Sequence, residues 1–237
     1  MNKAQLKIPS HIAIVMDGNS RWAKKHGKLQ SSGHKKGAEV SKVIAEACQD
    51  LGVKYLTLYA FSAENWNRSK AEVKVLMNLL RGYLKKDFNE LIKRDVRLRF
   101  IGDLSKLDAD IQKLIENAEE KSKDHSFTLI IALSYGSRDE IRNAAYKMAK
   151  HALMNGDTLE EVQPIDFDQF LYTNGIPDPD LFIRTSGEHR ISNFLLWQLS
   201  YSELYFTDVL WPDFNKKELI KAIEEFSKRE RRYGLRG

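Results

Sequence analysis

The 237-residue chain has a single cysteine, Cys48, which excludes an internal disulfide and a cysteine-rich zinc centre. Long apolar runs are also missing: stretches such as Leu129 to Leu133 are far shorter than the ~18 residues of a membrane-spanning helix. The first apolar run, Ile12 to Met16, is too short for a signal peptide. With 42% hydrophobic and 30% charged residues, we expect a folded protein in a reducing, cytoplasmic setting.

Signatures of nucleotide binding and of repeats are missing as well. The chain has no Walker-type loop, no G-x-G-x-x-G motif, no internal repeat and no linker rich in Pro, Gly and Ser. One domain over residues 1–237 is therefore expected.

The excess of basic residues is small and local. There are 38 Lys and Arg against 33 Asp and Glu, for a net charge of +5. Residues 18–38 contain six basic side chains and no acid, and residues 226–237 contain five basic side chains and one acid, so the remainder is net acidic. Two short basic stretches indicate an anionic partner. The charge alone leaves open the phosphates of a small substrate, a membrane surface and nucleic acid.

Short apolar runs rich in β-branched and aromatic residues alternate with helical patterns. The runs are Ile12–Met16, Tyr55–Phe61, Leu98–Ile101, Phe127–Leu133, Leu181–Ile183 and Leu204–Phe206. The helical patterns are Gly37–Leu51, a long one from a Ser69 cap to Arg94, Asp139–Leu153 and Lys216–Phe226. This alternation predicts an α/β domain with a central, mostly parallel six-stranded sheet surrounded by helices.

Polar segments follow three of the predicted strands. They are Asp17 and its neighbours, Ser62–Arg68 and Arg184–Ser192. Because ligands of such sheets bind at the carboxyl ends of the strands, we expect a site there.

The segment from Asp17 to Trp22 has an acid, a flexible Gly18 and a helix start with Asn19 or Ser20 as its cap. Such a turn suits a phosphate, with Mg²⁺ bridging it to the carboxylate. An ordinary strand-to-helix turn explains these residues equally well.

Three other sites carry candidate chemistry. Arg184 and Arg190, six residues apart with hydroxyls between them, could surround a diphosphate. Glu203 lies among aromatic residues, where a carboxylate requires a cation. His34 precedes a predicted helix, and a lone histidine is more often structural.

Taken together, these blocks resemble the cis-prenyltransferases, most closely the bacterial undecaprenyl diphosphate synthases. The similarity runs nearly end to end, through HIAIVMDGNSRWAKKHG, GHKKG, LTLYAFSAENWNR, PDPDLFIRTSGEHRISNFLLWQLSYSELYFTDVLWPDF and RERRYG. The resemblance implies a Mg²⁺-dependent homodimer that condenses isopentenyl diphosphate repeatedly, with cis geometry, onto an allylic diphosphate such as farnesyl diphosphate. It also implies an apolar tunnel, walled by the Ser69–Arg94 helix, and a product such as undecaprenyl diphosphate, the carrier lipid of cell-wall synthesis.

The resemblance also implies roles for individual residues. Asp17 would be the essential, Mg²⁺-holding aspartate, and Asn65, with Ser62 nearby, would assist proton removal. The allylic diphosphate pocket would comprise Gly18, Asn19, Ser20, Arg21 and His34. Isopentenyl diphosphate would contact Arg184, Arg190, Ile191 and Ser192. Glu203 and His189 would join the metal site around the dimer interface. Further pocket and loop positions are Trp22, Ala63, Glu64, Trp66 and Arg68, with Ala63 to Lys70 as a lid. Arg232 and Gly234 would complete the partner's site.

Four residues depart from the family pattern. Ser20 replaces a glycine, Gln30 an arginine, and Ser134 and Ser137 an asparagine and a glycine. These departures leave open the preferred allylic starter and its affinity. The sequence also leaves open the product length, which depends on side-chain volumes along the tunnel, and whether this is the main or a secondary synthase of its organism. A shorter-chain synthase and a non-catalytic subunit of the same fold stay as alternatives. Nucleic acid is not an expected partner, because no recognition motif is present. Peripheral contact with the inner face of a membrane is compatible with product delivery.

Overall fold

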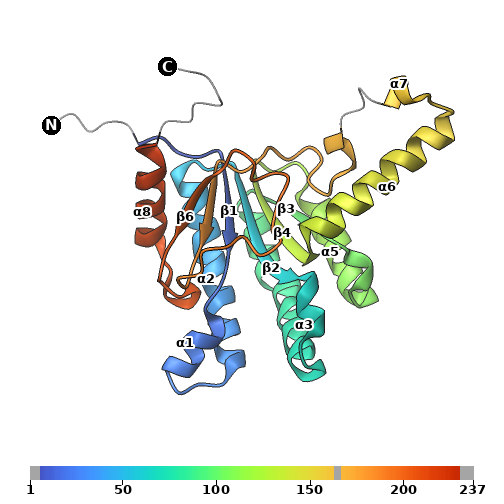
Figure 1. Cartoon of the computed structure of the whole chain (residues 1–237). Helices are drawn as coiled ribbons and strands as arrows, with labels where there is room; N and C mark the ends of the chain where they lie inside the picture. Colours follow the sequence, from blue (N-terminus) through green and yellow to red (C-terminus); the bar gives the residue numbers. More distant parts are fainter. Residues whose placement is uncertain (1–5, 163–166, 230–237) are drawn as a thin grey trace.

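In the computed structural model, which describes residues 6–162 and 167–229 without the side chains of residues 87–89 and 159, six parallel strands form one central sheet (Figure 1). The strands are β1 (His11–Val15), β2 (Tyr55–Ser62), β3 (Val96–Ile101), β4 (Phe127–Tyr135), β5 (Leu181–Arg184) and β6 (Glu203–Phe206). Their order across the sheet is β3-β4-β2-β1-β5-β6, with every neighbouring pair parallel. The predicted α/β fold and each of the six predicted strands are confirmed.

Helices surround this sheet. They are α1 (Asn19–Lys25), α2 (Gln30–Leu51), α3 (Lys70–Lys85), α4 (Asp87–Lys93), α5 (Ala109–Ser122), α6 (Ser137–Asn155), α7 (Leu159–Val162) and α8 (Lys216–Ser227). Short 3₁₀ turns are η1 (Ala63–Asn67), η2 (Leu104–Lys106), η3 (Phe167–Phe170) and η4 (Trp211–Asp213). None of the described helices has the length and apolar composition needed to cross a membrane.

The two faces of the sheet have separate apolar cores. Alternate residues of β1 show the division: Ile12 and Ile14 pack in the cluster that includes α2, α3, α5 and α8, whereas Ala13 and Val15 pack with Phe194 on the other face. This two-residue period is the ordinary consequence of strand geometry. All five β1 side chains are buried, as expected for a strand covered on both faces.

The prediction of one long helix from Ser69 to Arg94 is wrong, because this segment forms two helices, α3 and α4. Ser69 does cap α3, since its hydroxyl accepts the Glu72 N–H at 3.3 Å. At Lys86, however, φ and ψ are −110° and −60°, and the chain turns there into the separate helix α4. The turn lets both Leu84 of α3 and Leu91 of α4 be buried. The helix α5 was not predicted either, although its buried Ile111, Ile115 and Ala118 have helical spacing.

His11 provides a pH-dependent contribution to stability. Its Nδ1 lies 2.6 Å from the Pro177 carbonyl and its Nε2 lies 2.8 Å from the Thr57 hydroxyl, so the neutral ring donates at Nδ1 and accepts at Nε2. Burial lowers the pKa of His11 from 6.5 to about 4. Between these values the unfolded chain binds the proton and the folded chain does not, so the free energy of unfolding falls as the pH falls.

From pH 7 to pH 5 we expect this histidine to reduce the free energy of unfolding by about 2 kcal/mol. Urea unfolding of the wild type and of His11→Gln at both pH values measures the effect. The variant should lose less stability on acidification. An equal loss in the two proteins would contradict the assigned protonation of His11.

Candidate functional site

Three polar segments meet at one edge of the sheet. The strands β2, β1 and β5 are consecutive in the sheet and parallel, so their carboxyl ends lie side by side. Asp17 follows β1, η1 follows β2, and the segment from Thr185 follows β5. The structure therefore brings together the three polar segments at which the sequence predicted a site.

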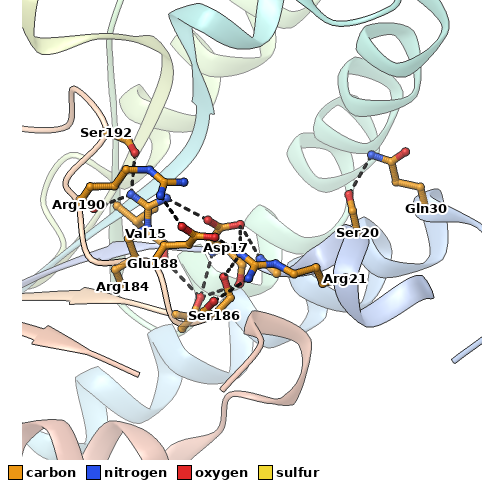
Figure 2. A network of polar contacts seen from close by, with 12 residues as sticks. Val15, Asp17, Ser20, Arg21, Gln30, Arg184, Ser186, Glu188, Arg190 and Ser192 are labelled. Carbon is orange, nitrogen blue, oxygen red and sulfur yellow. Dashed lines mark hydrogen bonds and ion pairs between the residues drawn. The ribbon is translucent and has the colours of Figure 1, made fainter. Parts of the chain in front are cut away.

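Asp17 and Arg184 form an ion pair at the centre of this edge (Figure 2). The Arg184 Nη2 donates to Asp17 Oδ2 at 3.0 Å, and its Nη1 donates to the Ser192 hydroxyl at 2.6 Å and to the Arg190 carbonyl. The Arg184 side chain is 4% exposed, whereas that of Asp17 is 33% exposed. The buried Arg184 therefore holds the Asp17 carboxylate in a position where it is partly exposed to solvent.

Thr185 fixes the backbone of Asp17. Its hydroxyl accepts the Asp17 N–H at 2.9 Å and donates to the Asp17 carbonyl at 2.7 Å. Asp17 Oδ1 in turn accepts the N–H of Gly18 at 2.8 Å. The carboxylate is therefore held in place before any ligand binds.

A second network connects α1 with the segment after β5. Arg21 donates to the carbonyl and the hydroxyl of Ser186 at 2.8 and 2.7 Å, and to Glu188 at 2.9 Å. Arg190 also pairs with Glu188, and this hydrogen bond, with the charges of Arg190 and Arg21, holds the pKa of Glu188 below its usual range. Figure 2 shows these side chains directed toward Asp17 from α1 and from the segment after β5. Two cations joined by one carboxylate can turn outward to hold a diphosphate.

The turn into α1 differs from the prediction at its cap. Gly18, with φ of +109°, is the N-cap, and neither Asn19 nor Ser20 makes a capping hydrogen bond. A side chain at Gly18 would be strained by this left-handed backbone and would contact Leu210 and Ser186 at 3.0 Å.

The start of α2 also differs from the prediction. The helix begins at Gln30 instead of Gly37, so Gly33 and His34 lie inside it. The helix is held against α1 at two glycines: a Cβ on Gly33 would lie 2.1 Å from the Asn19 carbonyl oxygen, and one on Gly37 would lie 2.2 Å from Asn19 Oδ1. Glycine is tolerated within α2 because it allows this close approach.

Gly33→Ala should consequently lower the free energy of unfolding by about 1–3 kcal/mol, because the new methyl must displace the α1 backbone. Gly82→Ala is the matched control, since Gly82 lies inside α3 and a Cβ added there would have no neighbouring atom within 4 Å. It should raise the free energy of unfolding by about 0.5–1 kcal/mol. Urea titrations compare the two, and equal effects would contradict the role of Gly33 in positioning α1.

An apolar cavity of about 180 Å³ opens beside this edge. Asn19 and His34 line it, together with apolar side chains of α2, α3, β2 and β4. On β4 the lining runs from Leu133, near the carboxyl end, back to Leu129, a length of about 13 Å at 3.3 Å per residue. The side chains of Leu76, Met77 and Leu80 on α3 form part of the wall, as expected from the sequence.

Two residues that line the cavity each have a buried polar atom without a hydrogen-bond partner among the described residues. These atoms are Asn19 Oδ1 and His34 Nε2. Burial and the nearby positive charge of Arg68 lower the pKa of His34, and Glu72 partly offsets them. A neutral His34 can donate one hydrogen bond from its ring, whereas Asn19 Oδ1 can only accept one.

The segment after β2 is an ordered 3₁₀ turn. Ser62 and Asn65 form a capping box, in which the Ser62 N–H donates to Asn65 Oδ1 at 3.2 Å. Glu64 accepts the Asn193 amide at 2.8 Å, and Arg68 donates to Glu72 at 2.7 Å. Ala63 begins this turn. The proposed lid is therefore tied to both α3 and the segment after β5, and its movement stays a prediction.

Other expected residues lie apart from this cluster. Glu203 pairs in register with Leu181 at the start of β5, whereas Arg184 pairs with Phe206, so Glu203 lies at the opposite end of β5 from Asp17. It has the cation that the sequence predicted, since Arg229 donates to it at 2.8 Å. Within one chain it therefore does not join Asp17.

Three further predicted residues have structural contacts. His189 lies against the Phe206 ring, with centroids 5.0 Å apart, at the same edge as Arg184. Trp22 is buried and donates to Asp213 at 2.7 Å, and it does not line the cavity. Ile191 packs against the core on the face of Phe194. Arg232 and Gly234 lie outside the described residues.

The sequence model of the family described as "Putative undecaprenyl diphosphate synthase" matches residues 15–234. The chain belongs to this family. It is 50% identical over 230 residues to an isoprenyl transferase of Aquifex pyrophilus, covering 97% of each chain. It is 51% identical over 228 residues to an isoprenyl transferase of Fusobacterium nucleatum, covering 96% of each. Among solved structures, lavandulyl diphosphate synthase of Lavandula x intermedia in complex with dimethylallyl diphosphate has a TM-score of 0.91 and 39% identity, covering 96% of this chain and 98% of that one.

Two departures of this undecaprenyl diphosphate synthase family member have structural explanations. Ser134, with φ of +48°, accepts the Trp66 indole N–H at 3.0 Å and so ties η1 to β4. Ser137 accepts the Leu196 N–H at 2.7 Å and lies 3.0 Å from the Tyr135 hydroxyl, which ties the start of α6 to the segment before β6.

Several residues of the cluster were not predicted to have separate roles. They are Glu72, Thr185, Ser186, Glu188 and Asn193. For Glu188 the sequence offered one signal of a role in the site, its position close to Arg184 and Arg190 in the Arg184–Ser192 segment. For Glu72 the sequence offered no such signal, because its contact with Gln30 joins α3 to a residue far away in the sequence.

The donor set in this family member fits Mg²⁺ held jointly by protein and substrate. Among the described residues, no three His, Cys, Asp or Glu side chains gather where they could hold a metal ion by themselves. Asp17 offers one partly exposed carboxylate beside the arginines that suit a diphosphate. One or two carboxylates completed by phosphate oxygens are the usual setting of protein-bound Mg²⁺.

Proposed function

We propose that this protein is a cis-prenyltransferase that condenses isopentenyl diphosphate repeatedly onto farnesyl diphosphate to give undecaprenyl diphosphate. The observation that carries the proposal is the direct connection of a polar edge with an apolar cavity. Met16 and Asn19, on either side of the Asp17–Gly18 turn, both line the cavity. A diphosphate bound at the edge would therefore have its hydrocarbon chain directed between α2 and α3. The relatives named isoprenyl transferases support this assignment.

The two diphosphates would bind on the two sides of Asp17. Arg184, Arg190 and Ser192 follow β5 and would take isopentenyl diphosphate. The allylic diphosphate would lie at the cavity mouth, near His34 and the Gly18–Arg21 turn, since its hydrocarbon part must reach the cavity. This division places the two reacting carbons between α1 and the segment after β5.

Asp17 would hold Mg²⁺ together with phosphate oxygens of the substrates. When bound, the ion would offset the negative charge that develops on the departing diphosphate. The residues themselves supply the remaining stabilisation. Arg21 and Arg190, which both pair with Glu188 here, would turn to the diphosphates and stabilise their negative charge. Ser62 and Asn65, at the end of β2, would assist removal of the proton from the new allylic product.

The cavity would shield both the reactive carbons and the growing chain from water. Water would quench an allylic cation, so η1 and Arg68 would need to stay closed during the condensation. Each added five-carbon unit would gain up to ~4 kcal/mol from burial, at ~0.8 kcal/mol per CH₂. Repeated addition therefore depends on apolar space that the growing product can enter.

We also propose a homodimer. Large apolar side chains are exposed on α6 and in the segment before β6: Tyr146, Leu153, Met154, Trp197 and Tyr201. The strand β6 is at the end of the sheet and leaves one hydrogen-bonding edge unpaired within it. A second copy of the chain would cover exposed apolar side chains of this kind. It would also give Glu203, His189, Arg232 and Gly234 their expected route to the metal site of the neighbouring subunit.

The experiment is an elongation assay on the purified full-length chain. Radiolabelled isopentenyl diphosphate is supplied with farnesyl or geranyl diphosphate, with Mg²⁺ or with a chelator, and the products are identified by mass spectrometry. We expect long products from farnesyl diphosphate, loss of turnover on chelation and recovery when Mg²⁺ is restored. No incorporation with either starter would contradict the enzyme and favour a non-catalytic subunit, and short products would identify a shorter-chain synthase.

A further inference from the structure

The side chain of Gln30 joins three helices, one helical turn from residues that line the cavity. Its Nε2 donates to the Ser20 hydroxyl of α1 at 2.9 Å and to Glu72 Oε1 of α3 at 2.9 Å. Figure 2 shows the contact with Ser20, which bridges the start of α2 to α1. Because a carboxylate only accepts hydrogen bonds, the partner Glu72 establishes that the amide nitrogen of Gln30 faces it. The assignment of the Gln30 amide nitrogen therefore rests on the acceptor character of Glu72 as well as on the distances.

This bridge also controls where Glu72 points. The oxygen of Glu72 that accepts Gln30 also accepts Arg68 Nη1 at 2.7 Å, so one carboxylate oxygen is shared by a neutral amide and a guanidinium. The Glu72 side chain is 25% exposed and that of Arg68 is 38% exposed. The carboxylate is thus held at a partly shielded position, where its charge acts over a longer range than it would in open solvent.

The network is one helical turn from the cavity lining on both helices. Gln30 precedes His34 by four residues on α2, and Glu72 precedes Leu76 by four residues on α3; His34 and Leu76 both line the cavity. The charges of Arg68 and Glu72 both act on the imidazole of His34. The unpartnered His34 Nε2 and Asn19 Oδ1 belong to residues that line the same cavity. An anion that accepted a hydrogen bond from His34 would therefore approach the negative charge of Glu72.

We propose that Ser20, Gln30 and Glu72 form one coupled unit that determines how tightly this protein binds the allylic diphosphate. This rests on the proposed function. The neutral amide of Gln30 holds Glu72 at the mouth, and Glu72 both repels the diphosphate and retains Arg68. The unit therefore weakens binding of the starter and leaves the isopentenyl diphosphate side, built on Arg184 and Arg190, unaffected.

The coupling has a specific consequence for Gln30→Arg. An added guanidinium at position 30 would lie beside Glu72 and would be neutralised by it instead of by the incoming diphosphate. Removing the charge of Glu72 would release the new cation for the ligand. The two substitutions should therefore be non-additive, as expected for residues in one network.

The test is a double-mutant cycle of the wild type, Gln30→Arg, Glu72→Gln and the double variant. Glu72→Gln keeps the acceptor oxygen for Gln30 and Arg68 but removes the charge. Titration calorimetry gives the Kd of farnesyl diphosphate and of inorganic diphosphate without turnover, and steady-state kinetics give the KM of each substrate and kcat. The matched control is Glu39→Gln, which removes a carboxylate from the exposed Lys36–Glu39 pair on α2.

We expect Glu72→Gln to tighten both diphosphates about tenfold, with the KM of isopentenyl diphosphate unchanged and Glu39→Gln without effect. Gln30→Arg should tighten binding at least about twofold more in the Glu72→Gln background than in the wild type. Unchanged Kd values in Glu72→Gln, or additive effects in the cycle, would overturn the coupled unit. If the Kd values change as expected but the protein transfers no prenyl group, the proposed function is rejected and the coupled unit is retained.

Discussion

Replacing Asp17 by alanine should reduce the turnover of isopentenyl diphosphate by about a thousandfold or more. The Asp17 carboxylate is the proposed ligand of Mg²⁺, and it lies partly exposed beside Arg184 and Arg21. Loss of a single preorganised electrostatic group costs about 10²–10³ in kcat, and a lost metal contact adds to this. Radiolabel incorporation at saturating concentrations of both substrates measures the effect. Retention of more than a tenth of the wild-type rate would refute the role of Asp17.

A loss of activity must be separated from a loss of structure. Removing the carboxylate leaves the Arg184 Nη2 without its ion-pair partner, and Arg184 is buried. Asp17→Asn is therefore tested beside Asp17→Ala, since the amide oxygen preserves an acceptor for Arg184 or for the N–H of Gly18. Asp50→Ala is the control, because Asp50 is exposed and pairs only loosely with Arg94 and Lys216. It should keep wild-type turnover, and all three variants should retain the wild-type circular dichroism spectrum.

The strands and the location of the site were predictable because local composition determines both. Runs of β-branched and aromatic residues such as Tyr55–Phe61 form the buried centre of a parallel sheet. The polar residues that follow β1, β2 and β5 then meet, since these strands are neighbours. The motif resemblance supplied the individual roles at Asp17 and Arg184, and the family membership supports that resemblance.

Contacts between distant residues were not predictable from single positions. The period of the apolar residues gave α2 a predicted start at Gly37, whereas the helix begins at Gln30. Its first turns contain Gly33 and Gly37 because α1 lies against that face of the helix. The position of Glu203 depends on its register with Leu181, which no local pattern reveals. The departures at Ser20 and Gln30 were separate observations in the sequence and become one hydrogen-bonded unit in the fold.

Ala60, which lines the cavity, is another residue whose position could not be predicted from the local sequence pattern. Along β2, Tyr59 pairs with Ala132 and Phe61 pairs with Leu133 on β4, so Ala60 is an extra residue that forms a bulge. Strict alternation would direct every second side chain away from the cavity, yet Tyr59, Ala60 and Phe61 all line it. The bulge therefore adds a small side chain to the wall of the space proposed for the growing product.

Ala60→Leu should shorten the product by one or more five-carbon units. Leucine adds three carbon atoms to the lining of a cavity of about 180 Å³, at a bulge whose neighbours Tyr59 and Phe61 are both paired with β4. The first condensation should stay within about threefold of the wild-type rate, because Arg184, Arg190 and Asp17 are untouched. Later additions become unfavourable when the chain meets the new side chain, since each unit then forfeits part of the ~4 kcal/mol that burial provides.

Mass spectrometry of products made from farnesyl diphosphate measures this change. Ala109→Leu is the matched control: Ala109 is the exposed first residue of α5 and does not line the cavity, so the product length should not change. An unaltered product distribution in Ala60→Leu would show that the growing chain leaves by another route than the space between α2 and α3. A shortened product with a normal first step would instead establish that chain length depends on apolar volume and is independent of the charged groups that bind the two diphosphates.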